Sequence, residues 1–161
     1  MKKISGIKKI VILDNIRSVH NVGSIFRTSD ALGIDKIYLC GCTPTPIDRF
    51  GRDRKDLAKV ALGAEKDIKW EYAKDTAELI KKLKKEKYQI IAVEQAENSI
   101  DYKKVQLNNQ VALVMGEEVK GLTQEAQKLA DVIAEIPMQG KKESLNVSVA
   151  FGIAGYEIFG K

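Results

Sequence analysis

The feature that most constrains the fold is a set of short, continuous apolar runs rich in valine and isoleucine. Alternating apolar and polar residues would predict strands with one solvated face. Continuous runs instead predict strands buried on both faces, as in a parallel sheet. We therefore expect strands at 10–14 (IVILD), 36–41 (KIYLCG), 89–95 (QIIAVEQ), 111–116 (VALVMG) and 132–138 (VIAEIPM).

Amphipathic segments separate these runs and predict helices at about 22–32, 55–65, 75–87, 123–129 and 146–159. Gly33 suits the left-handed position after a helix end, and Asp75 suits an N-cap. The alternation of strands and helices predicts a three-layer α/β domain with a mainly parallel sheet. Because the 161 residues contain no repeat, low-complexity tract or linker, we expect one domain spanning 1–161.

The charge balance favours a polyanionic partner. Lysine and arginine number 27 against 22 acidic residues, a formal net charge of +5. The lysines of KKLKKEKY (81–88) are typical of a solvated helix face. The cluster RFGRDRK (49–55) follows the turn-forming TPTP and is rich in arginine, whose forked guanidinium suits phosphate. Its three arginines, Arg49, Arg52 and Arg54, are the candidate RNA-binding residues.

Several protein classes are not expected. No apolar stretch approaches the roughly 18 residues of a membrane span. Cys40 and Cys42 are one residue apart and the chain has one histidine, so we expect neither a disulfide nor a metal site. The basic start MKKISGIKK is followed by an apolar segment that stops at Asp14 without a small-residue cleavage site. We therefore expect a cytoplasmic protein.

The segments after three predicted strands are dense in glycine, asparagine, serine or charge: DNIRSVHNVGS, GEEVKGL and QGKKESLN. In open α/β sheets, ligands bind beyond the carboxyl ends of the strands, so these segments are the candidate site. Neither GxGxxG nor GxxxxGK[ST] occurs, which removes the main support for a dinucleotide or P-loop site.

These segments, in this order, resemble the SpoU branch of the SPOUT RNA methyltransferases. HNVGSIFRTSDALG (20–33) resembles the first family motif, NxGxxxR, and GEEVKGL (116–122) the second, GxExxGL. IPMQGKKESLNVSVA (136–150) is similar to the third, which ends in SLNVSVA, and KVALGAE (59–65) is also common in this branch. The match covers almost the whole chain.

The resemblance implies methyl transfer from S-adenosylmethionine to a ribose 2′-hydroxyl of tRNA or rRNA. It also implies a C-terminal trefoil knot that forms the cofactor pocket, and a homodimer whose active sites are completed across the subunit interface. The first and last predicted helices are apolar enough to pack against each other or against a second copy. Relatives often carry an added RNA-binding domain; we expect none here.

By the resemblance, the catalytic residues include Asn21 and Arg27 of the first motif, with Arg27 the principal one. A guanidinium is a poor general base, so we expect Arg27 to hold the phosphate beside the target ribose and stabilise the hydroxyl as it loses its proton. A phosphate oxygen and a transiently neutral arginine are both open as proton acceptors. We expect Arg27 to reach back toward the sheet, whereas without the motif it would be a surface arginine paired with Asp30 or another carboxylate.

Glu118 matches the glutamate of the second motif. It could orient Arg27 through an ion pair, or favour the cationic donor electrostatically. The alternative is a loop charge in water.

By the same resemblance, Gly116, Ile136, Met138 and Leu145 supply backbone hydrogen bonds and apolar walls to the cofactor. Ser144 and Asn146 are then expected to project toward the reacting groups. Either would also serve as the N-cap of the last helix, and the two roles are compatible.

Two other functions are open. One is a knotted RNA-binding or assembly protein without turnover. The other, the best interpretation without the motifs, is an ordinary doubly wound nucleotide or phosphate binder.

Overall fold

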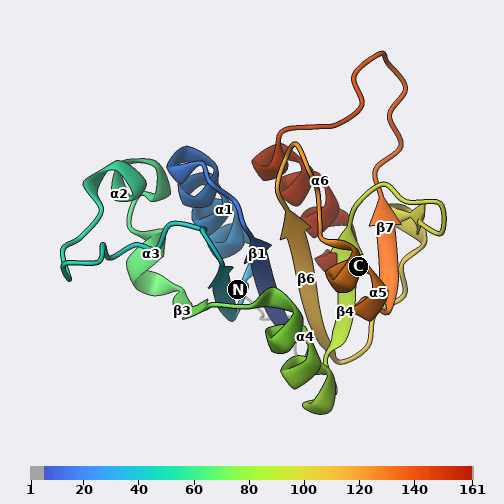
Figure 1. Cartoon of the computed structure of the whole chain (residues 1–161), viewed down its shortest axis with the longest axis horizontal. Coiled ribbons are helices and arrows are strands. Elements are labelled where there is room, and N and C mark those ends of the chain that lie inside the picture. Colours follow the sequence, from blue (N-terminus) through green and yellow to red (C-terminus); the bar gives the residue numbers. More distant parts are fainter. Residues whose placement is uncertain (1–5, 161) are drawn as a thin grey trace.

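The computed structural model describes residues 6–160, and within them seven strands form one sheet in the order β3-β2-β1-β6-β4-β7-β5 (Figure 1). Every pairing between these strands is parallel. The strands are β1 (Lys8–Asp14), β2 (Lys36–Cys40), β3 (Lys69–Ala73), β4 (Gln89–Val93), β5 (Ile100–Asp101), β6 (Gln110–Gly116) and β7 (Val132–Glu135). The helices are α1 (Val19–Leu32), α2 (Lys55–Ala61), α3 (Ala64–Asp67), α4 (Thr76–Lys85), α5 (Gln124–Leu129) and α6 (Val147–Phe159), with a 3-10 turn, η1, at Tyr102–Lys104.

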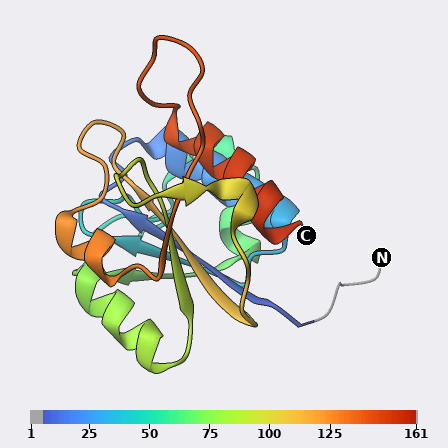
Figure 2. The same cartoon turned by 90° about the vertical axis from the view of Figure 1, so that its right-hand side faces the viewer.

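Helices cover both faces of the sheet, which confirms the predicted three-layer α/β fold. One core packs α1, α2, α3 and α6 against alternate strand residues such as Val11 and Leu113. The other packs α4 and α5 against their neighbours, such as Ile12 and Val114. Figure 2 shows the two helical layers on opposite sides of the strands. The trefoil knot stays a prediction.

The five predicted strands are all present, and two further strands were not predicted. β3 is an edge strand whose residues are mostly exposed, so it lacks an apolar run. β5 has only two residues, too few to leave a pattern.

The predicted helices are present, with one correction. Gly33 closes α1 at φ 68°, and Asp75 caps α4 by accepting from the backbone N–H of Glu78. The helix predicted at 55–65 is wrong as one element, because the left-handed backbone of Leu62 and Gly63 divides it into α2 and α3. No helix within 6–160 combines the length and hydrophobicity that crossing a membrane requires.

Gly23 of the first motif has a packing role. A Cβ there would lie 2.9 Å from Val60 Cβ and 3.0 Å from the Leu57 carbonyl oxygen, both on α2. Since the carbonyl cannot rotate away, a side chain at this position would force α1 and α2 apart.

The strand register places the candidate motifs side by side. Asp14, the last residue of β1, is paired with Cys40 of β2 and with Gly116 of β6. The segments that follow β1 and β6 therefore leave the sheet from adjacent points at one edge.

Asp14 is buried at this edge, where the Thr76 hydroxyl donates to its Oδ1 at 2.5 Å. Burial raises the pKa of Asp14 above its ordinary value of 3.8, against the opposing effect of the Thr76 hydrogen bond. Above pH 3.8 the unfolded state therefore loses this proton first. The protonated Asp14 carboxyl therefore favours the folded state. This contribution to the free energy of unfolding is complete below pH 3.8 and is lost as the pH rises through the native pKa.

We predict that Asp14→Asn removes this pH-dependent loss, because asparagine is uncharged and still offers an oxygen to Thr76. Urea unfolding of wild type and variant from pH 3.5 to 8 should show the variant gaining relative stability as the pH rises, and then a plateau. Asp30→Asn, on the exposed face of α1, controls for the loss of one negative charge. A stability difference between Asp14→Asn and wild type that stays constant with pH would contradict the assignment.

Candidate active site

A chain of hydrogen bonds connects the three motifs. The Asn21 amide nitrogen donates to Glu118 Oε1, and the Asn146 amide nitrogen donates to Asn21 Oδ1 at 3.1 Å. The three side chains come from α1, from the loop after β6 and from the start of α6. Residues 97 and 125 positions apart in the sequence thus meet at one point.

Asn146 is both the N-cap of α6 and a member of this chain. Its Oδ1 accepts from the backbone N–H of Ser148 at 2.9 Å and from the Ser148 hydroxyl at 2.6 Å. The oxygen therefore caps the helix, which leaves the amide nitrogen for Asn21. Asn21 is buried in the first turn of α1, where its own backbone N–H is bound by the N-cap Ser18.

The loop after β6 folds back on itself, and its two glycines permit this. A Cβ on Gly116 would lie 2.7 Å from the Leu122 backbone nitrogen, and Gly121 has a φ of 66°. The Gly121 N–H donates to the Glu117 carbonyl at 2.8 Å. At 116 only glycine leaves room for the Leu122 backbone without displacing the loop. At 121 glycine adopts the positive φ at little cost.

Glu94 supports the same loop and was missed by the sequence analysis. Its Oε2 accepts from the Leu122 backbone N–H at 2.8 Å, and its Oε1 from that of Gln95 at 2.9 Å. A signal existed, since Glu94 directly follows β4, whose carboxyl end lies at the same edge of the sheet as the motifs.

A pocket of about 360 Å³ opens beside Glu118, within the roughly 300–1,000 Å³ of ligand sites. The four predicted cofactor-binding residues, Gly116, Ile136, Met138 and Leu145, all line it. Its other lining residues are Val93, Glu94, Gln95, Met115, Glu117, Glu118, Val119, Lys120, Gly121, Gln127, Glu143, Ser144, Val147 and Ala150.

The pocket is lined by both acidic and apolar residues. Its charged lining consists of four glutamates and one lysine, a formal charge of −3. Its apolar lining comes from valine, methionine, isoleucine, leucine and alanine side chains. Such a site suits a ligand that carries positive charge and has an apolar part.

Ser144 lines the pocket two residues before the N-cap, so it belongs to the loop before α6 and not to the helix. Ser144 is exposed, and the capping role falls to Asn146.

Of the two roles left open for Glu118, the ion pair with Arg27 is not present among the described residues, because Glu118 binds Asn21 instead. Arg27 lies six residues after Asn21, about 240° around the helix, and is exposed. Within the described residues Glu118 accepts from Asn21, and no hydrogen bond or ion pair joins Arg27 to Glu118 or Asp30.

Arg49, Arg52 and Arg54 lie outside the pocket, in the loop between β2 and α2. Arg52 Nε lies 3.2 Å from Asp48 Oδ2, and an Arg54 nitrogen lies 3.5 Å from Asp56 Oδ2. Within residues 6–160, no group of three or more histidine, cysteine, aspartate or glutamate side chains is arranged to hold a metal ion.

The chain matches the model of the SpoU rRNA Methylase family over residues 8–156. It is 35% identical over 152 residues to a Staphylococcus saprophyticus protein assigned to the TrmH family of tRNA/rRNA methyltransferases; the match covers 94% of this chain and 58% of the relative. The chain thus spans less than two thirds of the length of such relatives.

Solved structures share the fold. An AdoMet-bound rRNA methyltransferase from Sinorhizobium meliloti superposes with a TM-score of 0.86 at 30% identity, over 96% of this chain and 56% of that one. The TrmH/SpoU tRNA modifying enzyme of A. aeolicus gives a TM-score of 0.82 at 30% identity, over 94% and 74%.

The two roles of Asn146 can be separated by substitution. Asn146→Ala removes the N-cap and should lower the free energy of unfolding by about 1 kcal/mol, whereas Asn146→Ser keeps a capping oxygen and should cost only a few tenths. Urea unfolding followed by circular dichroism measures both. If the serine variant loses as much as the alanine variant, the bond to Asn21, and not the cap, holds the start of α6.

Proposed function

Because this chain belongs to the SpoU rRNA Methylase family, we propose that it transfers a methyl group from S-adenosylmethionine to a ribose 2′-hydroxyl of RNA. The observation that carries the proposal is the hydrogen-bond chain from Glu118 through Asn21 to Asn146, beside a pocket that suits a cationic ligand. S-adenosylmethionine carries a sulfonium cation together with methylene groups and an adenine ring, which suit the acidic and apolar residues that line the pocket.

The cofactor would be held by Gly116, Ile136, Met138 and Leu145, which line the pocket. Gly116 and Leu145 lie on its opposing loops, after β6 and before α6. When bound, the cofactor supplies an electrophilic methyl group for an in-line displacement at carbon. The residues of the chain then have to bring the ribose oxygen into line and exclude water.

Glu118 would supply negative charge to a pocket that holds a sulfonium cation, and its hydrogen bond from Asn21 fixes where that charge lies. Asn146 holds Asn21 in turn, and Ser144 lines the same pocket. We assign Asn21, Asn146 and Ser144 as positioning groups beside the pocket. In the reaction the carbon–sulfur bond breaks, the oxygen–carbon bond forms and the hydroxyl proton must leave.

We propose that Arg27 contacts the RNA phosphate beside the target ribose and stabilises the oxygen as its proton leaves. Its guanidinium is exposed and has no carboxylate partner among the described residues, so its donors are available to a phosphate.

The RNA is tRNA or rRNA. The reducing cytoplasm would be compatible with the exposed free thiol of Cys42.

We predict that Arg27→Ala reduces methyl transfer to RNA by about 100-fold or more without weakening cofactor binding, because Arg27 does not line the pocket. Transfer of labelled methyl to RNA from cells lacking the gene measures turnover, and titration calorimetry measures S-adenosylmethionine binding. Lys66→Ala removes an exposed charge from α3 and serves as the control. Equal loss of turnover and binding would make Arg27 structural. Binding of RNA and cofactor without turnover in the wild type would favour an RNA-binding or assembly protein.

We also propose that the chain is a homodimer joined through α6. Val149, Ile153 and Tyr156 form an exposed stripe along this helix, at 48%, 38% and 55% exposure, while its other side packs on α1 so closely that a Cβ on Gly155 would lie 2.7 Å from Leu32 Cδ1. A second copy on this stripe would bury apolar surface that is otherwise solvated. It would also bring a second α1 near the site, as expected if Arg27 acts across the interface.

Ile153→Asp should therefore produce a monomer, because it places a charge at the centre of the stripe. Sedimentation should give twice the chain mass of 17.9 kDa for the wild type and the single mass for the variant. Leu62→Asp, at an exposed leucine in the α2–α3 turn, should sediment as the wild type does. A dimeric Ile153→Asp variant would exclude this face.

A further inference from the structure

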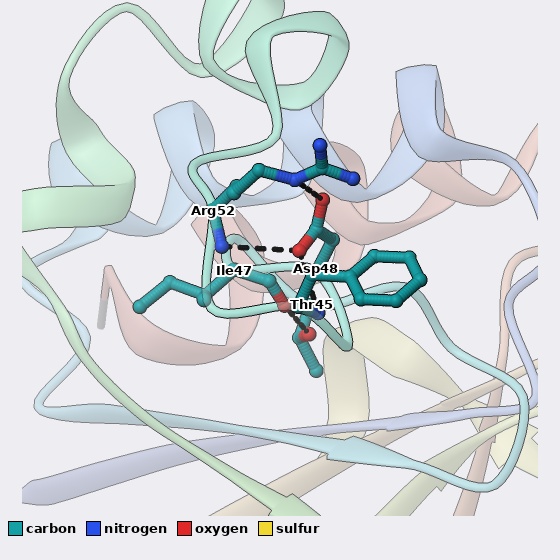
Figure 3. Close-up of polar contacts among 5 residues, drawn as sticks. Thr45, Ile47, Asp48 and Arg52 are labelled. Atoms are coloured by element: carbon teal, nitrogen blue, oxygen red, sulfur yellow. Dashed lines mark hydrogen bonds and ion pairs between the residues drawn. The ribbon is translucent and has the colours of Figure 1, made fainter.

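The loop between β2 and α2 ends in a tip, Ile47–Asp53, that its own hydrogen bonds hold in one shape. Ile47 and Asp53 form an antiparallel bridge across its base. Asp48 Oδ1 accepts from the backbone N–H groups of Phe50 and Arg52 at 2.8 and 3.0 Å, and Asp48 Oδ2 lies 3.2 Å from Arg52 Nε (Figure 3). These bonds lower the pKa of Asp48, and Gly51 completes the turn at φ 76°.

The tip presents an aromatic ring to solvent, with two arginines close to it. Phe50 is 65% exposed, so it adds little to the core. The guanidinium carbons of Arg49 and Arg52 lie 4.8 and 5.0 Å from the centre of its ring. Within the described residues, only one carboxylate pairs with these two arginines, and it binds Arg52 through Nε, which leaves the terminal nitrogens of Arg52 available.

The loop that carries the tip leaves β2 at the same edge of the sheet as the pocket loop leaves β6. β2 and β6 are separated by one strand, β1, and all three run parallel. At about 4.8 Å per strand spacing, the end of β2 is about 10 Å from the end of β6. Contact with both places requires an RNA strand that extends from the pocket along this edge of the sheet as far as the tip.

We infer that Phe50 stacks on the base of an unpaired nucleotide of the RNA, while the guanidiniums of Arg49 and Arg52 move from the ring to the adjacent phosphates. The inference rests on the proposed RNA methyltransferase function and narrows its substrate to RNA that is single-stranded near the target. Bases inside a duplex have no free face, whereas splayed bases stack on exposed aromatic rings and arginine planes. Because the tip is already ordered by Asp48, little conformational freedom is lost on binding.

Arg54 has a lesser role in this arrangement. It follows the tip, and its guanidinium is engaged by Asp56. Of the three arginines predicted to bind RNA, we therefore assign direct contact to Arg49 and Arg52.

The test is the affinity of a fluorescent RNA hairpin with an unpaired loop, measured by anisotropy with S-adenosylmethionine present. Phe50→Ala should weaken binding about 5- to 150-fold, as expected for the loss of one base–aromatic stack. Phe50→Trp should bind as tightly as the wild type, because tryptophan restores a stacking surface. Leu62→Ala is the matched control, since Leu62 is also 65% exposed.

Wild-type affinity in Phe50→Ala would overturn the inference, and so would an equal loss for a fully paired duplex of the same sequence, which would mean that no base is stacked. Conversion of Phe50→Ala to a monomer would also overturn it, by placing the ring in a protein interface. The proposed function is tested separately, by cofactor calorimetry and methyl transfer. If the protein binds RNA but does not methylate it, a weaker affinity of Phe50→Ala would still show base stacking. If the protein does methylate RNA, wild-type affinity of Phe50→Ala would still overturn the inference.

Discussion

The parallel pairing of β6 with both β1 and β4 is the constraint on which the site depends. Parallel strands must return through a crossover, so their carboxyl ends lie at one edge. That edge receives the loop after β1, which leads to Asn21, the loop after β6, which carries Glu118, and Glu94 after β4. Hydrophobic burial on both faces fixes the sheet, and the sheet in turn brings together polar residues that are distant in sequence.

At this edge the same side chains serve the fold and the site. Asn146 caps α6 with its oxygen and holds Asn21 with its nitrogen. Gly116 lines the pocket and also allows the backbone of the loop to pass close to it. The glycines of the motifs are therefore explained by close packing, whereas the amides and the carboxylate are explained by the hydrogen bonds among them.

Two exposed features extend the functional surface beyond the pocket. Arg27 projects from α1 away from Asn21, and the tip at Ile47–Asp53 carries Phe50 into solvent. Both Arg27 and Phe50 are exposed and are not part of the hydrophobic core. We propose that both contact the phosphates and bases of RNA, and a dimer through α6 would add the corresponding surfaces of a second copy.

Continuous apolar runs and capping residues by themselves determined the layers of this protein. Local chemistry and burial on both strand faces predicted the α/β class and the helix ends at Gly33 and Asp75. They also predicted five of the strands: β1, β2, β4, β6 and β7. The motifs also identified the residues that meet at the site. Only the tertiary structure decided the strand order, the edge strand β3, the division of 55–65 at Leu62 and the partner of Glu118. These depend on which backbones approach one another and on where a helix turn points a side chain. Asn21 and Arg27 lie on different faces of α1 because they are six residues apart. Spacing alone does not say which of these faces meets Glu118. That is decided only when α1 packs on the sheet.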